Sequence, residues 1–297
     1  MLPTVLLVLS QAGTVVFGGD VMLNGIPVKA KPLAALAPKF KAADLAIVNL
    51  EIPLTNSKDR TKRKTAEELK RRDQFILRGD PRHLPHLKAV GIDMVSLANN
   101  HAMDFGPGGL REMIEGLDKL GIAHAGAGRN AAEAERVAVV RAKGKRIGLV
   151  SYLAFMSAGA LRKCTPATDT TAGIAVLSFG GKPDTRKIEA IVQKAKASCD
   201  ILVVGLHWGI ERKTKPTGYQ IALGKAFLDA GADVVWGNHP HVLQPAVSVD
   251  GKPIMYSMGN LVSPLPAAAA LARWTIGDAK VSLIPYRIVG GRAVTEK

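Results

Sequence analysis

Apolar runs rich in valine, isoleucine and leucine recur along the chain and alternate with segments of helical periodicity. Uninterrupted apolar runs of this length are typical of strands buried on both faces of a parallel sheet. They predict strands at Thr14–Gly18, Asp44–Asn49, Ile92–Ala98, Ile201–Leu206 and Asp233–Trp236. Because strands and helices alternate, the pattern indicates an α/β protein.

Apolar residues at helical spacing predict helices at Leu110–Leu120, Ile188–Ala195 and Tyr219–Ala230. The third helix is expected to end at Gly231, because glycine is favoured just after a helix C-terminus. Strands, helices and hairpins together predict a four-layer α-β-β-α sandwich, in which two mixed sheets pack together with helices outside.

Turn residues between short apolar segments predict two β-hairpins, one closed by Lys143-Gly144 and the other by Asp250-Gly251. A last strand is expected at Val281–Val289. The alanine-rich segment Pro264–Ala272 is expected to be a loop that runs into a short helix and carries no chemistry.

The first twelve residues, Met1–Ala12, are apolar and end with the small residues Ser10 and Ala12. This is typical of the apolar region and cleavage site of a secretory signal peptide. A basic start is missing, so a buried first strand is the alternative. Interpretation as a signal peptide predicts an exported protein of the cell envelope, on the periplasmic or extracellular face. A cytoplasmic location stays open. Residues 13–297 show no internal repeat or clear linker, so we predict a single domain there.

Charge changes the expected partners. Forty lysines and arginines against 25 acids give a formal net charge of +15, which favours a polyanionic partner: nucleic acid, anionic lipid headgroups or an acidic polymer. The segment Lys58–Arg72 holds eight basic and three acidic residues and is either a solvated surface or a contact for such a partner. Nucleic acid is not expected, because the chain has no basic motif interleaved with aromatic residues. Cys164 and Cys199 form a candidate disulfide only if the protein is exported.

Six apolar runs end in metal-ligand or hydrogen-bonding residues. In chain order these are Asp20; Asn49 and Glu51; Asn99, Asn100, His101 and Asp104; His207, Trp208 and Glu211; His239 and His241; and Asn260. Ligands of α/β proteins bind outside the carboxyl ends of the strands, so we expect these side chains to converge on one crevice. The sequence therefore predicts a shared metal site.

The ligand types narrow the choice of metal. Carboxylates, a carboxamide and imidazoles without a thiolate suit one or two ions of manganese, zinc or iron. A carboxylate that bridges two ions about 3.5–4 Å apart is the arrangement that activates water and clamps a phosphoryl group. His239 and His241 are two residues apart, so an extended backbone would point both imidazoles the same way. A polar loop that caps a sheet is the alternative for this pair.

Six segments carry recognisable motifs: Gly18–Leu23, Asn49–Glu51, Leu97–Gly106, His207–Glu211, Gly231–Pro245 and Tyr256–Asn260. The most specific elements among them are Asn99-Asn100-His101-Ala102-Met103-Asp104-Phe105-Gly106 and Gly237-Asn238-His239-Pro240-His241-Val242-Leu243-Gln244. In this order, and over about Thr14 to Val289, the chain resembles the CapA-type family of capsule and poly-γ-glutamate biosynthesis proteins. That family is similar in fold to the calcineurin-like metallophosphoesterases, which have a two-metal centre. The resemblance thus implies the same four-layer sandwich.

The resemblance also implies roles for the polar residues. One metal would be held by Asp20 and His241, the other by Asn100, His207 and His239, with Glu51 as the bridge. His101 would protonate the leaving group. Two positions depart from the superfamily pattern: Met22 stands where a histidine is usual, and Glu51 where an aspartate is usual. Because a thioether is a poor ligand for a hard ion, the first site is one ligand short.

Asp104 is predicted to take part in catalysis together with His101. Asp104 and Asn99 either orient His101 or cap the helix that begins near Pro107. For Trp208, stacking on substrate and packing in the core both remain open. Arg78 is expected to bind a substrate carboxylate or phosphate, with a surface salt bridge as the alternative.

The residues Asn49, Asn99, Glu211 and Asn260 complete the predicted substrate site. Two functions follow from these observations. One is a metal-dependent hydrolase that acts on a phosphorylated substrate, or on the amide or ester linkages of an acidic envelope polymer. The other is a non-catalytic accessory protein that binds such a polymer during export or anchoring, together with membrane-associated capsule machinery. The complete carboxylate, asparagine and histidine set favours the enzyme, whereas Met22 and the positive charge favour the accessory protein.

Overall fold

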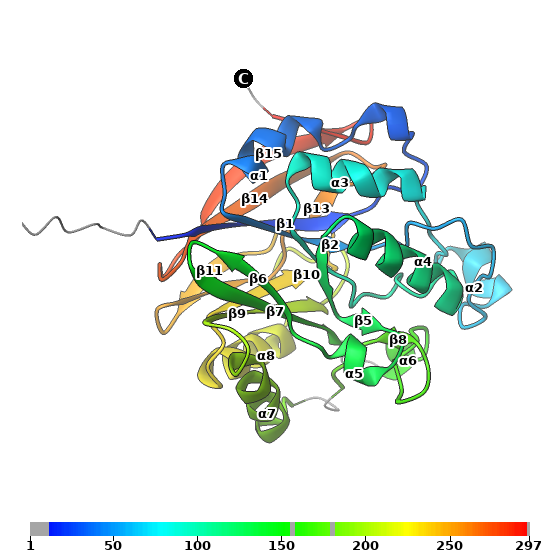
Figure 1. Ribbon diagram of the computed structural model, residues 1–297. Coiled ribbons are helices and arrows are strands. Elements are labelled where there is room, and N and C mark those ends of the chain that lie inside the picture. The colour runs from blue at the N-terminus through cyan, green and yellow to red at the C-terminus, as the bar shows by residue number, and fades with distance from the viewer. Residues whose placement is uncertain (1–11, 155–157, 179–181, 296–297) are drawn as a thin grey trace, which may run out of the picture.

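Two β-sheets lie face to face, with helices on both outer faces (Figure 1). This computed structural model describes residues 12–154, 158–178 and 182–295, so the predicted apolar lead lies outside the described residues except for Ala12. The layers confirm the predicted four-layer α-β-β-α sandwich.

The first sheet has the strand order β16-β15-β14-β1-β2-β3-β4, with β13 paired to the end of β1. β1, β2, β3 and β4 are parallel, whereas β14, β15 and β16 are antiparallel neighbours. The strand bounds are β1 Thr14–Val21, β2 Leu45–Leu50, β3 Met94–Ser96, β4 Ala123–Ala125, β13 Asn260–Val262, β14 Ala267–Thr275, β15 Ser282–Val289 and β16 Arg292–Val294. Its outer face is covered by α1 (Ala37–Lys41), α3 (Leu84–Val90) and α4 (Gly106–Lys119).

The second sheet has the order β11-β12-β10-β9-β7-β6. Its strands are β6 Ala138–Ala142, β7 Lys145–Ala154, β9 Ile201–Trp208, β10 Val234–Asn238, β11 Ala246–Val249 and β12 Lys252–Met255. Two helices, α7 (Thr185–Lys196) and α8 (Gly218–Asp229), cover the outer face (Figure 1). Smaller elements complete the described chain: the strand pair β5 Ala127–Gly128 and β8 Gly173–Ile174, the helices α2 Ala66–Arg71, α5 Ala131–Ala134 and α6 Ala158–Leu161, and the 3-10 turns Val28–Ala30, Ala34–Leu36 and Pro81–His83.

Three apolar clusters fill the three spaces between the layers. Successive side chains of a strand point to opposite faces, so each central strand contributes to two clusters. On β1, Val15 and Phe17 pack between the sheets, whereas Val16 packs toward the helices. On β9, Val203 lies between the sheets and Val204 faces α7 and α8. Burial on both faces explains why these strands have continuous apolar sequences.

The five predicted strands, the three helices and both hairpins are present with boundaries shifted by a few residues. One prediction is wrong: Pro264–Ala272 does not lead into a helix, because Ala267–Thr275 is strand β14. Alanine has the highest helix propensity of all residues, but such propensities are small, and here pairing with β1 and β15 outweighs that preference. Cys164 and Cys199 are both free and buried, in different apolar clusters. Among the described helices, none is both long enough and apolar enough to cross a membrane.

Candidate metal centre and active site

Two buried carboxylates form the centre of the site. Asp20 lies on β1 and Glu51 directly follows β2, and neither side chain is exposed. Asn49 on β2 pairs with Asp20 in the parallel register. Its amide nitrogen donates to Asp20 Oδ1 at 2.8 Å and to Glu51 Oε2 at 3.2 Å. Asn49 has no exposed surface, so the prediction that it contacts substrate is wrong: it holds the two carboxylates in place.

Two glycines let backbone segments approach at this point. A Cβ atom on Gly19 would lie 2.0 Å from the carbonyl oxygen of Gly259, and one on Gly237 would lie 2.2 Å from that of Tyr256. Such distances exclude any side chain at either position. The close approach at Gly19 accompanies the hydrogen bond from the Asp20 amide to Gly259 O, at 2.9 Å, and so fixes where Asp20 enters the site.

The three histidines come from the second sheet. His207 is part of β9, and His239 and His241 follow β10. The extended backbone predicted for the last two is wrong, because His239 and His241 have φ angles of +99° and +57°. Positive φ is rare for residues other than glycine and is tolerated where the surroundings impose it. The imidazoles converge through this left-handed turn, with ring centroids 6.0 Å apart.

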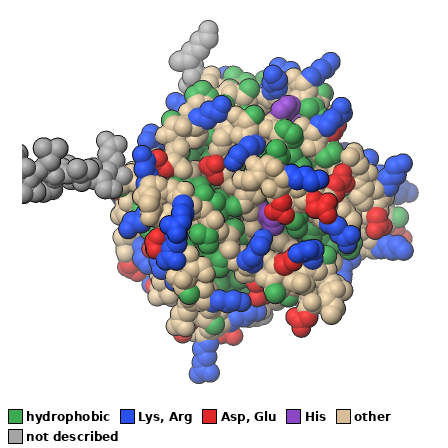
Figure 2. Space-filling model, in the orientation of Figure 1, with side chains coloured by type: hydrophobic (Ala, Val, Ile, Leu, Met, Phe, Trp, Pro, Cys, Tyr) green, Lys and Arg blue, Asp and Glu red, His purple; other side chains and the backbone are tan. Residues whose placement is uncertain are grey.

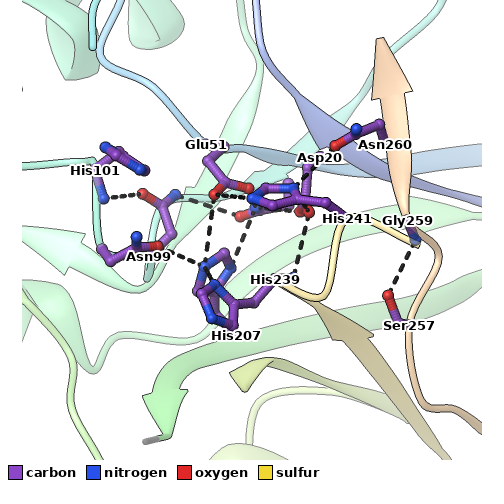
Figure 3. Close-up of polar contacts among 12 residues, drawn as sticks. Asp20, Glu51, Asn99, His101, His207, His239, His241, Ser257, Gly259 and Asn260 are labelled. Atoms are coloured by element: carbon purple, nitrogen blue, oxygen red, sulfur yellow. Dashed lines mark hydrogen bonds and ion pairs between the residues drawn. The ribbon is translucent and has the colours of Figure 1, made fainter. Parts of the chain in front are cut away.

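The ligand atoms form two groups that share Glu51 (Figure 3). The first group is Asp20, Glu51 and His241, and the second is Glu51, His207 and His239; the atoms within each group lie within 4.8 Å of one another. Asn100 belongs with the second group, since its Oδ1 lies 2.8 Å from His207 Nε2. The structure thus brings together all six residues predicted as metal ligands.

The surroundings of the Glu51 carboxylate show whether a metal fits this site. Its Oε1 is buried and has no hydrogen-bond partner. His241 Nε2 lies 3.6 Å and His207 Nε2 3.7 Å from this oxygen, too far for hydrogen bonds. Ligands that share an ion at about 2.0–2.2 Å are separated by distances of this order. An oxygen with unused lone pairs facing imidazoles from both groups therefore suits a bridge between two divalent cations.

Burial and charge set the protonation of the cluster. Burial raises the pKa of Glu51 well above its usual range, and the charge of Asp20 adds to the effect. Burial also opposes protonation of His241, but the charges of Glu51 and Asp20 outweigh it and raise its pKa to about 10. For Asp20, burial is outweighed by the hydrogen bond and charge of His241, which lower its pKa. A protonated His241 thus supplies positive charge to the first group.

The other two histidines behave in the opposite way. Burial lowers the pKa of His239 to about 3, and the charge of His241 acts in the same direction. Burial also places the pKa of His207 well below its usual range, with a further contribution from His239. Both imidazoles are therefore neutral, which is the form that binds metals.

His101 is oriented by a buried acid. His101 Nδ1 lies 2.7 Å from Asp104 Oδ2, and Asp104 also accepts from the amide of Leu77 at 2.8 Å and forms a fully buried ion pair with Lys64. α4 begins at Gly106, and its N-cap residue is Phe105, which makes no side-chain cap. The interpretation of Asp104 as a helix cap is therefore wrong, and the orienting interpretation is supported.

Asn99 shapes the turn that carries His101. Its side-chain oxygen accepts from the amides of His101 at 3.1 Å and Ala102 at 2.8 Å, and its nitrogen donates to Leu50 O at 2.9 Å. Because Asn99 is 1% exposed, we correct its assignment as a substrate contact. It positions the backbone that follows β3.

Lys64 is a residue that the sequence did not single out. It belongs to the basic segment Lys58–Arg72, which is interpreted above as a solvated surface or a contact for an anionic partner, but Lys64 itself is 4% exposed. Besides Asp104, its Nζ donates to Phe75 O at 2.8 Å and to Asn100 O at 3.2 Å. No local pattern distinguishes Lys64 from its exposed neighbours, because its partners are distant in sequence.

Two predicted substrate contacts lie away from the opening of the site. Trp208 is fully buried, stacks on Tyr256 and donates to its carbonyl oxygen at 2.8 Å, so the core alternative is correct. Arg78 is exposed, donates to Ser57 O at 2.6 Å and lies 4.9 Å over the ring of Phe105. Neither residue lines the cavity over the ligand cluster.

The other two predicted contacts do reach that cavity, which has a volume of 950 Å³ and is also lined by His101 and His241. Asn260 Oδ1 lies 2.9 Å from His241 Nδ1. Glu211 is exposed, and its carboxylate forms a third potential ligand group with His239 and His241. Glu211 is thus placed to add a ligand from the cavity side.

Comparison with known proteins identifies the family. The model of a family described as bacterial capsule synthesis protein PGA_cap matches residues 14–265. The chain belongs to this family. The resemblance predicted from the motifs is thereby confirmed.

Two relatives of the PGA_cap chain carry related descriptions. It is 32% identical over 228 residues to the PGA biosynthesis protein CapA of Bacillus subtilis (strain 168), a match that covers 76% of this chain and 54% of that protein. It is 34% identical over 178 residues to the capsule biosynthesis protein CapA of Bacillus anthracis, covering 59% of this chain and 41% of that protein. The chain spans about half the length of the curated relatives it matches.

A solved structure shares the architecture of this PGA_cap chain. The crystal structure of a phosphatase from Mycoplasma pneumoniae matches it with a TM-score of 0.56, covers 95% of both chains and is 15% identical. Identity this low shows the fold alone. The fold is metallophosphatase-like.

Proposed function

We propose that this chain is a metal-dependent hydrolase that cleaves phosphoesters during capsule or polyglutamate synthesis. The observation that carries the proposal is Glu51 Oε1, which is buried without a hydrogen bond between the imidazoles of His207 and His241. Its position between two ligand groups supports a centre with two manganese, zinc or iron ions. Cleavage of amide or ester linkages in an acidic polymer would use the same centre.

The chain's residues have distinct roles in this proposal. Bound ions would lower the pKa of a shared water and neutralise the phosphoryl oxygens. Asp20 and His241 would hold one ion, and Asn100, His207 and His239 the other. His101, oriented by Asp104, lines the cavity beside them.

The reaction forms one P–O bond and breaks another. A water oxygen attacks phosphorus and gives up one proton to the solvent, and the ester P–O bond breaks. Its electron pair stays on the alcohol oxygen, which takes a proton from His101, and His101 regains a proton from the solvent. Burial and the charge of Lys64 lower the pKa of His101, while Asp104 opposes them. The negative charge of a bound phosphoester favours the protonated imidazole that this step requires.

A non-catalytic accessory role is the second candidate, and Met22 favours it. This residue lines the cavity beside the first ligand group, where its thioether adds little affinity for a hard ion. The positive charge of the chain suits an acidic polymer, bound at the cell envelope next to membrane-associated capsule machinery. In this case, neutralising the exposed bases of Lys58–Arg72 should weaken polymer binding in a salt-dependent way.

The experiment that separates the two roles combines metal analysis with turnover. Purified protein is loaded with manganese, zinc or iron and assayed with a panel of phosphoesters and glutamyl peptides. His101→Ala should lose on the order of 10²–10⁴-fold in turnover, the usual contribution of acid–base catalysis, and should retain its metal. Tight polymer binding that is indifferent to metal, without turnover for any metal supplied, would establish the accessory role instead.

A further inference from the structure

The cavity over the ligand cluster is mostly apolar. At 950 Å³ it lies in the upper part of the size range of small-molecule sites. Its polar residues include His101, His241 and Asn260 beside the ligand groups, whereas Phe75, Leu77, Val242, Leu243 and Leu265 are among its apolar walls. A substrate bound here thus meets a polar reaction centre and an adjoining apolar surface.

Two of the apolar wall residues face solvent. Leu265 is 65% exposed and Phe75 is 45% exposed. Each exposed leucine or phenylalanine alone would be unremarkable, but both border one concave surface next to the ligand cluster. Exposed apolar surface that is contiguous and concave marks a binding site.

One apolar wall is held by the same residues that orient His101. Lys64 donates to Phe75 O at 2.8 Å, and Asp104 accepts from the Leu77 amide at 2.8 Å. Asp104 and Lys64 are themselves paired, and Asp104 contacts His101. The wall therefore has a fixed position relative to the imidazole that would protonate the leaving group, so a leaving group at His101 lies against apolar side chains.

The charges that line the cavity suit one anionic group. Arg72 and Arg212 line it, and so does the acid Glu211. Among the basic residues between Lys58 and Arg72, only Arg72 reaches it, and Lys64 is buried. Figure 2 shows lysine and arginine side chains spread over the visible face without gathering into one patch. A polyanion needs cations along its length, which this apolar cavity does not offer.

We propose that the substrate is a lipid phosphate, a phosphate ester of a hydrocarbon-chain alcohol, with its phosphate at the ligand cluster and the chain of its leaving alcohol against Phe75, Leu77 and Leu265. This inference rests on the proposed hydrolase function and specifies its substrate class. The chain stays in the cavity through burial of apolar surface, while the arginines and the bound ions neutralise the phosphate.

The test is a chain-length series. Release of inorganic phosphate from methyl, butyl and octyl phosphate, all kept below micelle-forming concentrations, is measured with the metal-loaded protein. kcat/KM should rise by up to about fourfold for each buried methylene group. Leu265→Asp should reduce the octyl-to-methyl ratio at least tenfold. Leu283→Asp is the matched control: Leu283 is 51% exposed on β15 and does not line the cavity, so the ratio should be unchanged.

A binding measurement separates this inference from the hydrolase function. Calorimetry with methyl- and octylphosphonate, which are not hydrolysed, should show tighter binding of the octyl compound and loss of this preference in Leu265→Asp. If no ester is cleaved but this preference is found, the hydrolase proposal fails and the lipid-phosphate site stands. Equal turnover or equal binding of short and long chains overturns the inference. A glutamyl oligomer is tested as a competitor. If it displaces octylphosphonate, and if its own binding is unchanged in Leu265→Asp, the cavity binds the acidic polymer and the inference is also overturned.

Discussion

The two ligand groups of the proposed metal centre share Glu51 but differ in charge. The first group, with Asp20 and His241, has two fully buried carboxylates and an imidazole whose pKa is raised to about 10. In the second group, burial keeps both His207 and His239 neutral, with a pKa of about 3 for His239. The second group can accept an ion without losing a proton from an imidazole, whereas the first must exchange its proton for an ion. The two groups therefore differ in whether an imidazole must lose a proton before an ion binds.

The largest expected effect is on the second group. His239→Ala removes a proposed direct ligand, so metal occupancy of this group should fall by more than the 10–100-fold that loss of a supporting residue typically costs. Metal content after desalting, measured by atomic spectroscopy, checks this. His86→Ala is the control, because His86 is half-buried and lies outside all three ligand groups. Equal metal content in the two variants would contradict the assignment.

The support behind the second group is tested by Lys64→Met. This change leaves Asp104 buried without its cation, so the free energy of unfolding should fall by about 3–5 kcal/mol, as when one member of a buried pair is removed. Urea denaturation measures it. Lys225→Met, which breaks an exposed pair with Asp229, should cost about 1 kcal/mol or less. Similar losses in both variants would show that the Lys64 pair contributes no more than a surface pair.

The difference in charge predicts a difference in pH dependence. His241 is protonated below its raised pKa of about 10, so loading the first group should release a proton, and its affinity should rise by up to about tenfold per pH unit until that pKa is reached. The imidazoles of the second group should release none. Calorimetry in buffers of different ionisation enthalpy counts the protons for each ion bound. Because the pKa of the shared Glu51 is also raised, its proton leaves with whichever ion binds first. The two ions together should therefore release one proton from Glu51 and one from His241, and a total of one or fewer refutes the comparison.

The smallest effect is expected at Glu211. This exposed carboxylate lies near both His239 and His241, but water can replace it, so Glu211→Gln should weaken binding of one ion less than about tenfold. Titration with manganese detects this change. Glu189→Gln, an exposed glutamate on α7, should leave the titration unchanged. A complete loss of one ion would mean that Glu211 is a principal ligand of the first group.

The sequence by itself determined the strands of this fold through local patterns: continuous apolar runs, each followed by a polar residue. Those runs identify strands buried on both faces, and the parallel strands bring residues such as Asp20 and Glu51 to one edge. Successive residues of a strand point to opposite faces, so a run of apolar residues shows by itself that both faces are buried. The ligand set could be predicted for the same reason.

Other features depended on distant contacts. The left-handed backbone at His239 and His241 is imposed by its surroundings and not by residue type. Pairing with β1 and β15 converts the alanine-rich segment into β14. Likewise, whether a lysine in a basic run is solvated or buried depends on an acid 40 residues away, as for Lys64 and Asp104.

The cavity is the clearest case of a feature that only the tertiary structure decided. Phe75, Val242 and Leu265 come from three separate segments, and none carries a local pattern that marks a binding surface. Their common orientation follows from the packing of the two sheets and from hydrogen bonds such as Lys64 to Phe75 O. The sequence thus determined the strands and the ligand types, because these follow from neighbouring residues. The tertiary structure decided the shape and polarity of the site, because these follow from contacts between residues far apart in the chain.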